Sequence, residues 1–335
     1  MSAPAEPPRP AARTTGRQPW LDAVKVVATA LVVFWHLHPL PTWGPAALPR
    51  AVRFFEFEVS LIAVPTFLIA SLYLFFAHGG AAPEKLRGRL SRLGGIYLFW
   101  TAVQIAVAVA LGTAGTPSLR WITAGGPGLP YVYDSIFYYL FDLLALTALG
   151  AGYAHLGRAR AAVGWTVVVG SALYFEWALL AGVAIPYHRL DAFLLYVPIA
   201  HALWARPAAF TRARGLFALG WLVFAAHDVV LGAAGGALAY RCVYGRITVV
   251  LGALALLTAA QAAGLRARPL VTLLSTYSLG IYAVHKYFQV LGLWLAERHP
   301  VPPLPPSLLV LGVTLVGTAV TLAVLSRTPL RRFVA

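Results

Sequence analysis

Four ionisable side chains lie within residues 20–39, WLDAVKVVATALVVFWHLHP, a run that is otherwise apolar: Asp22, Lys25, His36 and His38. Positions eleven apart in an α-helix return to nearly the same face, so Lys25 and His36 would share one side, roughly 16 Å apart along the axis. Asp22 falls on that face one turn before Lys25, whereas His38 points away from it. A charged group at the centre of a membrane span costs roughly 2.5 to 3.5 kcal/mol, so this polar stripe needs a reason.

His36 is the side chain of the stripe best suited to proton transfer. An imidazole of ordinary pKa, near 6.5, can accept a proton from a hydroxyl at neutral pH. His36 lies deeper in the run than Asp22 or Lys25, and ionisable groups at such depth usually face the bundle interior and serve function. The simpler interpretation of Asp22 and Lys25 is a pair near the interface whose side chains reach towards water. We therefore predict that His36 faces the bundle interior and has a functional role.

The composition indicates what kind of protein carries this stripe. Of the 335 residues, 60% are hydrophobic and 11% are charged, and the mean hydropathy is +0.75, unlike a soluble globular domain. Apolar runs of about 20 residues, the length that spans a bilayer, occur ten times. They are 20–39, 54–77, 94–113, 131–150, 161–182, 190–205, 215–235, 242–264, 271–296 and 306–326. We predict an all-α integral membrane protein of about ten transmembrane helices.

The distribution of cations predicts the orientation, because Lys and Arg near span ends are retained on the cytoplasmic side. With the N-terminus inside, 17 of the 26 Lys and Arg residues fall in inner segments and 7 in outer ones, and Lys25 and Lys286 lie within spans. Both termini are therefore predicted to be cytoplasmic. We expect a disordered Pro-rich tail at 1–18 and one membrane domain at 19–335, multi-pass in the cell membrane.

The net charge and the cysteine content indicate which classes of partner to expect. The net charge of +15 follows from this topology, and no basic stripe of the kind that binds nucleic acid is present. The one cysteine, Cys242, has no partner for an internal disulfide, and no Cys/His spacing predicts a metal site. We therefore expect neither nucleic acid nor a metal ion as a partner.

Three further stretches follow the first-span stripe along the chain. The second span contains VPTFLIASLYLFF (64–76), RLSRLGGIYLFW (89–100) leads into the third, and the ninth contains STYSLGIYAVH (275–285). With Asp-x-x-Lys-x(10)-His in the first span, and in this order on a ten-span chain, they resemble the acyltransferase-3 family of polytopic membrane acyltransferases. The aromatic segment 135–146 loosely resembles the fourth span of that family.

The chain departs from the family pattern at three positions. Lys25 stands where Arg is typical, Leu72 replaces a Gly, and Gly95 replaces a Pro. Lys keeps the charge but lacks the planar two-pronged donor with which Arg binds phosphate or carboxylate. The sequence therefore leaves open whether Lys25 changes which acyl-group donor the protein prefers.

The resemblance implies an O-acyltransferase. Such an enzyme moves an acyl group, often acetyl, from acyl-CoA to a hydroxyl of a carbohydrate, a surface glycan or a secreted small molecule. Acyl-CoA would be a co-substrate rather than a permanently bound cofactor, and the acceptor and membrane lipid would be the other partners. His36 would be the base, and Lys25, Arg89 and Arg92 would bind the donor at the cytoplasmic side, where cations meet its phosphates.

Other polar residues within or beside the predicted spans have weaker claims. The candidate supporting residues are Asp22, Ser71, Glu176, Tyr282 and His285. Glu58 is expected at an interface, and Asp228 as a hydrogen-bonding group between helices. Two alternatives to an enzyme stay open: a transporter whose ionisable groups relay protons, and a non-catalytic protein with the same fold. The matching halves typical of many transporters are not found in the sequence.

Overall fold

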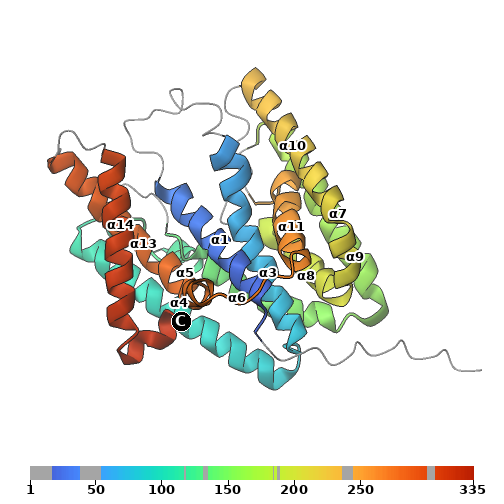
Figure 1. The fold of residues 1–335 in the computed structure, drawn as a ribbon, viewed down its shortest axis with the longest axis horizontal. Helices are drawn as coiled ribbons and strands as arrows, with labels where there is room; N and C mark the ends of the chain where they lie inside the picture. Colours follow the sequence, from blue (N-terminus) through green and yellow to red (C-terminus); the bar gives the residue numbers. More distant parts are fainter. Residues whose placement is uncertain are drawn as a thin grey trace, which may run out of the picture.

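The computed structural model of the chain (Figure 1) describes residues 17–37, 54–116, 118–130, 135–183, 185–186, 189–235, 244–299 and 306–335. The elements within these residues are helices and include no strand, which confirms the all-α class. The longer helices are α1 (Pro19–Leu37), α3 (Ala63–Ala77), α4 (Pro83–Ala110), α6 (Tyr138–Ala154), α7 (Arg160–Leu180), α8 (Tyr196–Ala205), α10 (Arg214–Gly235), α11 (Ile247–Ala262), α13 (Ser278–Arg298) and α14 (Pro306–Leu325). The shorter elements are α5 (Leu119–Ala124), α9 (Pro207–Arg212), α12 (Pro269–Thr276), a π-helical turn η1 (Phe55–Val59) and the 3-10 turns η2 (Ser60–Ile62), η3 (Gly157–Ala159), η4 (Leu190–Phe193) and η6 (Pro329–Phe333).

Each predicted span coincides with one of these helices or with consecutive ones. Five helical segments are long and apolar enough to cross a membrane by length and composition, which supports an integral membrane protein. They are Pro19–Leu37, Phe55–Ala77, Pro83–Ala110, Gly157–Leu180 and Ser307–Leu325. Two shorter apolar helices, Leu190–Ala205 and Ile247–Ala262, match further predicted spans. The count of ten crossings and the side on which the termini lie stay predictions.

Two helices differ from the apolar runs that predicted them. α4 begins at Pro83, well before the predicted start at 94, because Pro is well placed in a first helical turn and the charged residues that follow are good helix formers. The ninth run is split at Tyr277, where the backbone angles are φ −96° and ψ 10°. The Ser278 hydroxyl donates a hydrogen bond to the Ser275 carbonyl at this break. Apolarity marks the membrane-embedded part of a helix but not such breaks.

Helix α1, which carries the polar stripe, runs through the middle of the bundle (Figure 1). It contacts α3 and α11 as well as α12 and α13. Its packed face includes Val24 and Val32, and Ala28 on the same face is completely buried. A small residue at this point lets neighbouring helices approach α1 closely. Asp22 of the stripe is only 6% exposed, and Lys25 and His36 are half-buried, so protein encloses much of the stripe.

Helices α13 and α14 form a closely packed pair beside α1. A Cβ atom placed at Gly292 of α13 would lie 2.9 Å from the Cα atom of Val310 in α14. One at Gly317 of α14 would lie 2.2 Å from the ring of Phe288. Glycine at both positions permits a helix separation that a side chain would prevent.

Candidate active site

His36 of α1 and His285 of α13 meet in the interior of the bundle. The Nδ1 atom of His36 lies 2.9 Å from the Nε2 atom of His285. The ring centroids are 5.0 Å apart and the planes are inclined by 33°. The structure thus brings together the predicted catalytic base and one of the predicted supporting residues.

The hydrogen bonds of this histidine pair determine where the protons lie. Nδ1 of His285 is 2.7 Å from the carbonyl oxygen of Tyr282 and 3.0 Å from that of Ile281. Carbonyl oxygens only accept, so Nδ1 of His285 carries a proton. In the neutral ring, favoured because His285 is only 1% exposed, Nε2 then accepts a hydrogen bond from Nδ1 of His36. The nitrogen of His36 that has a lone pair to accept a proton is therefore Nε2.

The main chain around His36 is also tied to α13. The side-chain amide of Gln289 donates a hydrogen bond to the carbonyl oxygen of His36. Gln289 lies one turn beyond His285 on the same helix, so two neighbouring side chains of α13 hold the end of α1. The position of the His36 ring is consequently set by α13.

A small cavity of about 20 Å³ lies beside His36. Its polar lining consists of Ser60 and three tyrosines, Tyr138, Tyr244 and Tyr282. The hydroxyl of Tyr138 donates to that of Tyr244 over 3.1 Å, and the hydroxyl of Tyr282 donates to the carbonyl oxygen of Ile136. A polar cavity of this volume has room for one water molecule or one small group. The cavity is thus of a size for a reacting hydroxyl next to the base.

Of the three predicted donor-binding cations, Arg89 is the one most involved in packing. Its Nη2 atom donates to the Ser71 hydroxyl over 2.8 Å and to the Ser71 carbonyl over 3.0 Å. Its guanidinium also lies 5.4 Å from the ring centroid of Phe75. Two predicted site residues, Arg89 and Ser71, are therefore direct partners that join α4 to α3.

Lys25 and Arg92 lie near each other at the same end of the bundle. Lys25 is half-buried and within electrostatic range of Arg92, Asp22 and Arg17. Arg92 is exposed, and its Nη2 atom donates to the main-chain oxygen of Ala335 over 3.2 Å. Asp22 offsets part of the repulsion among these cations, and the exposed Arg92 is placed where an anionic ligand can reach it.

Asp22 takes part in a structural contact. One carboxylate oxygen accepts a hydrogen bond from Nε of Arg17 over 2.6 Å, and the other accepts one from the Ser275 hydroxyl, also over 2.6 Å. Arg17 donates in addition to the carbonyl oxygen of Thr272 over 2.8 Å. These bonds join the start of α1 to α12. The hydrogen-bonded partners of Asp22 are thus Arg17 and Ser275, whereas its interaction with Lys25 is electrostatic.

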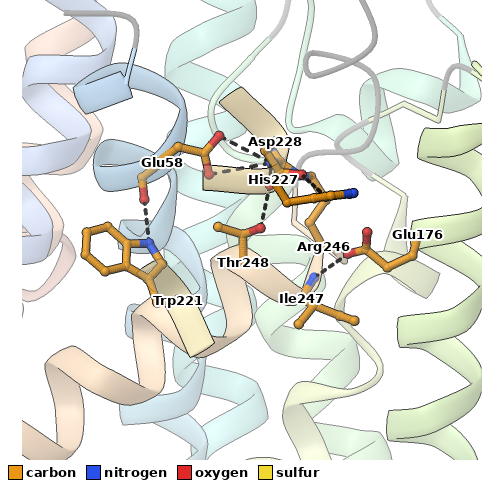
Figure 2. A network of polar contacts seen from close by, with 8 residues as sticks. All are labelled: Glu58, Glu176, Trp221, His227, Asp228, Arg246, Ile247 and Thr248. Atoms are coloured by element: carbon orange, nitrogen blue, oxygen red, sulfur yellow. Dashed lines mark hydrogen bonds and ion pairs between the residues drawn. The ribbon is translucent and has the colours of Figure 1, made fainter. Parts of the chain in front are cut away.

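A second group of charged residues is completely enclosed between η1, α10 and the start of α11 (Figure 2). Nη2 of Arg246 donates to Glu58 over 3.2 Å and forms an ion pair with Asp228. The Asp228 carboxylate also accepts a hydrogen bond from the Thr248 hydroxyl over 2.5 Å. Arg246 is 0% exposed, and both carboxylates are at most 3% exposed. We call Glu58, Asp228 and Arg246 the buried ion cluster.

Glu176, a predicted supporting residue, lies next to this cluster (Figure 2). Its carboxylate accepts a hydrogen bond from the main-chain N–H of Ile247 over 2.9 Å. Ile247 opens α11, and a carboxylate is stabilising at a helix N-terminus, where the N–H groups have no partner in the helix. The described hydrogen bond of Glu176 is therefore a capping contact.

The sequence prediction missed the buried ion cluster. It counted Arg246 as an outer-loop cation and placed Glu58 at an interface. Charged residues beside apolar runs are the signal that could have found the cluster, because they need a partner when buried. The partners are 188 and 18 residues apart in the chain, so spacing alone does not pair them. His38, which is expected on another face of α1 than the stripe, lies outside the described residues.

In the part of the chain that the structure describes, no group of three or more His, Cys, Asp or Glu side chains is placed to hold a metal ion.

A family model described as "Acyltransferase domain", that of acyltransferase-3, matches residues 18–325. Comparison with curated proteins gave no match, and comparison with solved structures gave none. The family match covers nearly the whole described structure and includes the α1 stripe, both histidines and the cations at the end of the bundle. The chain belongs to the acyltransferase-3 family, whose members are membrane acyltransferases.

Proposed function

We propose that this acyltransferase moves an acyl group from acyl-CoA to a hydroxyl of a carbohydrate, a surface glycan or a secreted small molecule, as a multi-pass protein of the cell membrane. The observation that carries the proposal is the hydrogen bond between His36 and His285, since it leaves Nε2 of His36 able to accept a proton. An acyl transfer to a hydroxyl needs a base at this step. Acetyl is the smallest acyl group that the proposal includes.

The reaction begins with proton removal from the acceptor. Nε2 of His36 takes the hydroxyl proton while the acceptor oxygen attacks the thioester carbonyl carbon. The tetrahedral intermediate then collapses, the carbon–sulfur bond breaks, and the ester remains on the acceptor. The leaving thiolate of CoA takes the proton back from His36, so the imidazole is regenerated and no other reagent is consumed.

His285 acts through His36 and is a positioning residue. Its Nε2 atom accepts the hydrogen bond from Nδ1 of His36 and holds the ring in the tautomer that the base needs. The same hydrogen bond persists when His36 is protonated, because Nδ1 donates in both forms. This arrangement resembles the way in which a third group orients the base of other nucleophilic sites.

The donor is expected to approach from the end of the bundle where Lys25 and Arg92 lie. Arg92 is exposed and its hydrogen bond to the main-chain oxygen of Ala335 lies at the surface, whereas Arg89 is half-buried and bonded to Ser71, so Arg92 is the more accessible of the two to a phosphate of CoA. A guanidinium binds phosphate through two parallel hydrogen bonds. We assign Arg92 and Lys25 the direct contacts with the donor, and Arg89 the support of the helix that carries Arg92.

The test is acceptor-dependent release of CoA. Purified protein in detergent is incubated with radiolabelled acyl-CoA and a panel of hydroxyl-bearing acceptors, and both free CoA and labelled ester are measured. We expect equal amounts of CoA and ester, and loss of both in His36→Ala. Uptake of a solute into proteoliposomes without ester formation would instead indicate a transporter and overturn the proposal.

A further inference from the structure

A groove of about 460 Å³ is lined by residues of α1, α12, α13 and α14 and reaches His285. The face of α14 that lines it comprises Thr314, Leu315, Thr318, Ala319, Leu322 and Ala323, followed by Ser326 just beyond the helix. At 1.5 Å per residue, this face extends over roughly 18 Å. Lys25, Arg89 and Arg92 do not line the groove, so it is distinct from the predicted binding site for the donor phosphates.

The two ends of the groove differ in chemistry. Thr314 and Thr318 lie in the middle of α14, and from there Ala319, Leu322 and Ala323 continue the lining as a mainly apolar wall towards Ser326. The other polar residues of the lining are His285 and Tyr277. Thr318 is 6% exposed, and its hydroxyl has no hydrogen-bond partner among the residues that the structure describes. A buried hydroxyl without a partner costs free energy, so it is available to a polar atom of a ligand.

This polarity selects one kind of occupant. A ligand with a single polar group at the inner end and a hydrocarbon chain behind it would satisfy Thr318 and cover the apolar wall. The pantetheine arm of CoA carries amide groups along its length, which would lose hydrogen bonds to water against that wall. A hydrocarbon tail of the bilayer would cover the wall but leave the Thr318 hydroxyl without a partner.

We infer that the groove binds the hydrocarbon chain of the acyl group, with the thioester carbonyl at the end lined by His285 and Thr318. The inference rests on the proposed function and deepens it, since it names the substrate class: medium- or long-chain acyl donors rather than acetyl alone. The carbonyl then lies close to His36, because His285 lines the groove and is hydrogen-bonded to His36. The chain extends along α14 towards Ser326.

Chain-length selectivity tests the inference in the wild-type protein. Ester formation is measured with acetyl-, butyryl-, octanoyl- and myristoyl-CoA and one acceptor. We expect kcat/KM to rise about fourfold for each added methylene until the groove is filled, the ratio that corresponds to about 0.8 kcal/mol per buried CH₂. Transfer of acetyl at the highest rate, with a decline for longer chains, would overturn the inference and leave the proposed function standing.

Two neighbouring positions of α14 provide matched variants. Ala319 lines the groove, whereas Val320 does not and is 58% exposed. Ala319→Phe would fill the groove, so we expect the ratio of octanoyl to acetyl transfer to fall at least tenfold. Val320→Phe adds the same ring on another face and should leave both rates at the wild-type value. Equal losses of both activities in Ala319→Phe, or a selective loss of octanoyl transfer in Val320→Phe, would contradict the assignment.

A binding measurement separates this inference from the proposed reaction. A non-hydrolysable thioether analogue of octanoyl-CoA with a diazirine at the end of its chain is photolysed with the protein in vesicles, and labelled peptides are mapped. We expect labels on α12 or α14 that excess unlabelled analogue removes and Ala319→Phe prevents. Labels elsewhere, or labels that the unlabelled analogue does not displace, would overturn the inference even in an active enzyme. Displaceable labels in a protein without transfer activity would support the groove and contradict the reaction.

Discussion

His36 and His285 are separated by 249 residues in the chain, yet their imidazole nitrogens are 2.9 Å apart. The bond joins α1, which carries the polar stripe, to α13, which also lines the groove that we propose binds the acyl chain. The carbonyl oxygens of Ile281 and Tyr282 accept a hydrogen bond from Nδ1 of His285. Nε2 of His285 is therefore the acceptor, and Nδ1 of His36 the donor, of the bond between the two rings. In the proposed mechanism the pair therefore supplies one base, Nε2 of His36, and one orienting partner, His285.

The base is tested first. His36→Ala should leave the protein inserted and lower kcat/KM by about 10²-fold or more, the usual contribution of a positioned base. The measurement is ester formation in protein that elutes as a single species in detergent. His38→Ala is the control and should retain wild-type activity. Wild-type turnover in well-folded His36→Ala would exclude His36 as the base.

The orienting partner gives a different pattern. His285→Ala removes the acceptor for Nδ1 of His36, so the base loses its preferred tautomer and kcat should fall by about tenfold or more with little change in KM for acyl-CoA. His285→Gln keeps an acceptor at that position and should recover part of kcat. If His285→Ala changes KM for acyl-CoA and leaves kcat intact, His285 contributes to binding in the groove and does not orient His36.

Donor binding is tested at Arg92 rather than Arg89. A charge-assisted hydrogen bond contributes about 1.5 to 3 kcal/mol, so Arg92→Ala should raise KM for acyl-CoA roughly ten- to a hundredfold and leave KM for the acceptor unchanged. Arg89→Ala also removes the bonds to Ser71, so a loss of activity there would not separate binding from folding. An unchanged donor KM in Arg92→Ala would mean that Arg92 only anchors the topology.

Lys25 offers a gain-of-function test. Lys25→Arg restores the residue typical of the family and adds the two-pronged donor that suits phosphate. We expect Lys25→Arg to keep or lower the donor KM, whereas Lys25→Ala should raise it. Equal effects of both substitutions would show that packing at position 25, rather than charge, determines the outcome.

The sequence predicts the helices and the shared face of α1 well, and it predicts long-range partners poorly. Apolar runs identify helices because a helix that spans a membrane needs about 20 consecutive, mainly apolar residues. Lys25 and His36 share a face because helical geometry is local. The resemblance named His36 and His285 separately, but their contact depends on the packing of α1 against α13, which no spacing encodes.

The buried ion cluster is a second set of long-range partners that the sequence does not predict. From the sequence, Glu58 is expected at an interface, Asp228 as a hydrogen-bonding group between helices, and Arg246 as a cation of an outer segment. Only the packing of η1 against α10 and α11 makes them partners. Tyr244, two residues before Arg246, lines the cavity beside His36, so the cluster and this cavity share one short stretch of the chain.

Topology can be tested with introduced cysteines in a Cys242→Ser background. Glu84→Cys and Ala208→Cys should react only with reagent on the cytoplasmic side, because both positions are exposed and lie in predicted inner segments. Gly115→Cys should react only from outside. Gly115 and Gly125 both lie in the predicted outer segment between the third and fourth spans, and Gly115 is the better labelling site. A Cβ atom at Gly115 meets nothing within 4 Å, whereas one at Gly125 would lie 2.3 Å from Phe137. The opposite labelling pattern would reverse the predicted orientation.

The buried ion cluster yields the last prediction, which concerns stability. Arg246→Met removes the only cation in contact with two buried carboxylates within the described cluster, and breaking such a pair costs about 3 to 5 kcal/mol. We expect a clear fall in the midpoint of thermal unfolding in detergent. Neutralising the carboxylates as well, in Arg246→Met with Glu58→Gln and Asp228→Asn, should recover much of that loss, because no uncompensated charge remains. Arg189→Ala breaks an exposed ion pair with Asp191, so it should change stability by about 1 kcal/mol at most. If the triple variant is no more stable than Arg246→Met, the loss comes from packing around the Arg246 side chain rather than from unpaired charge.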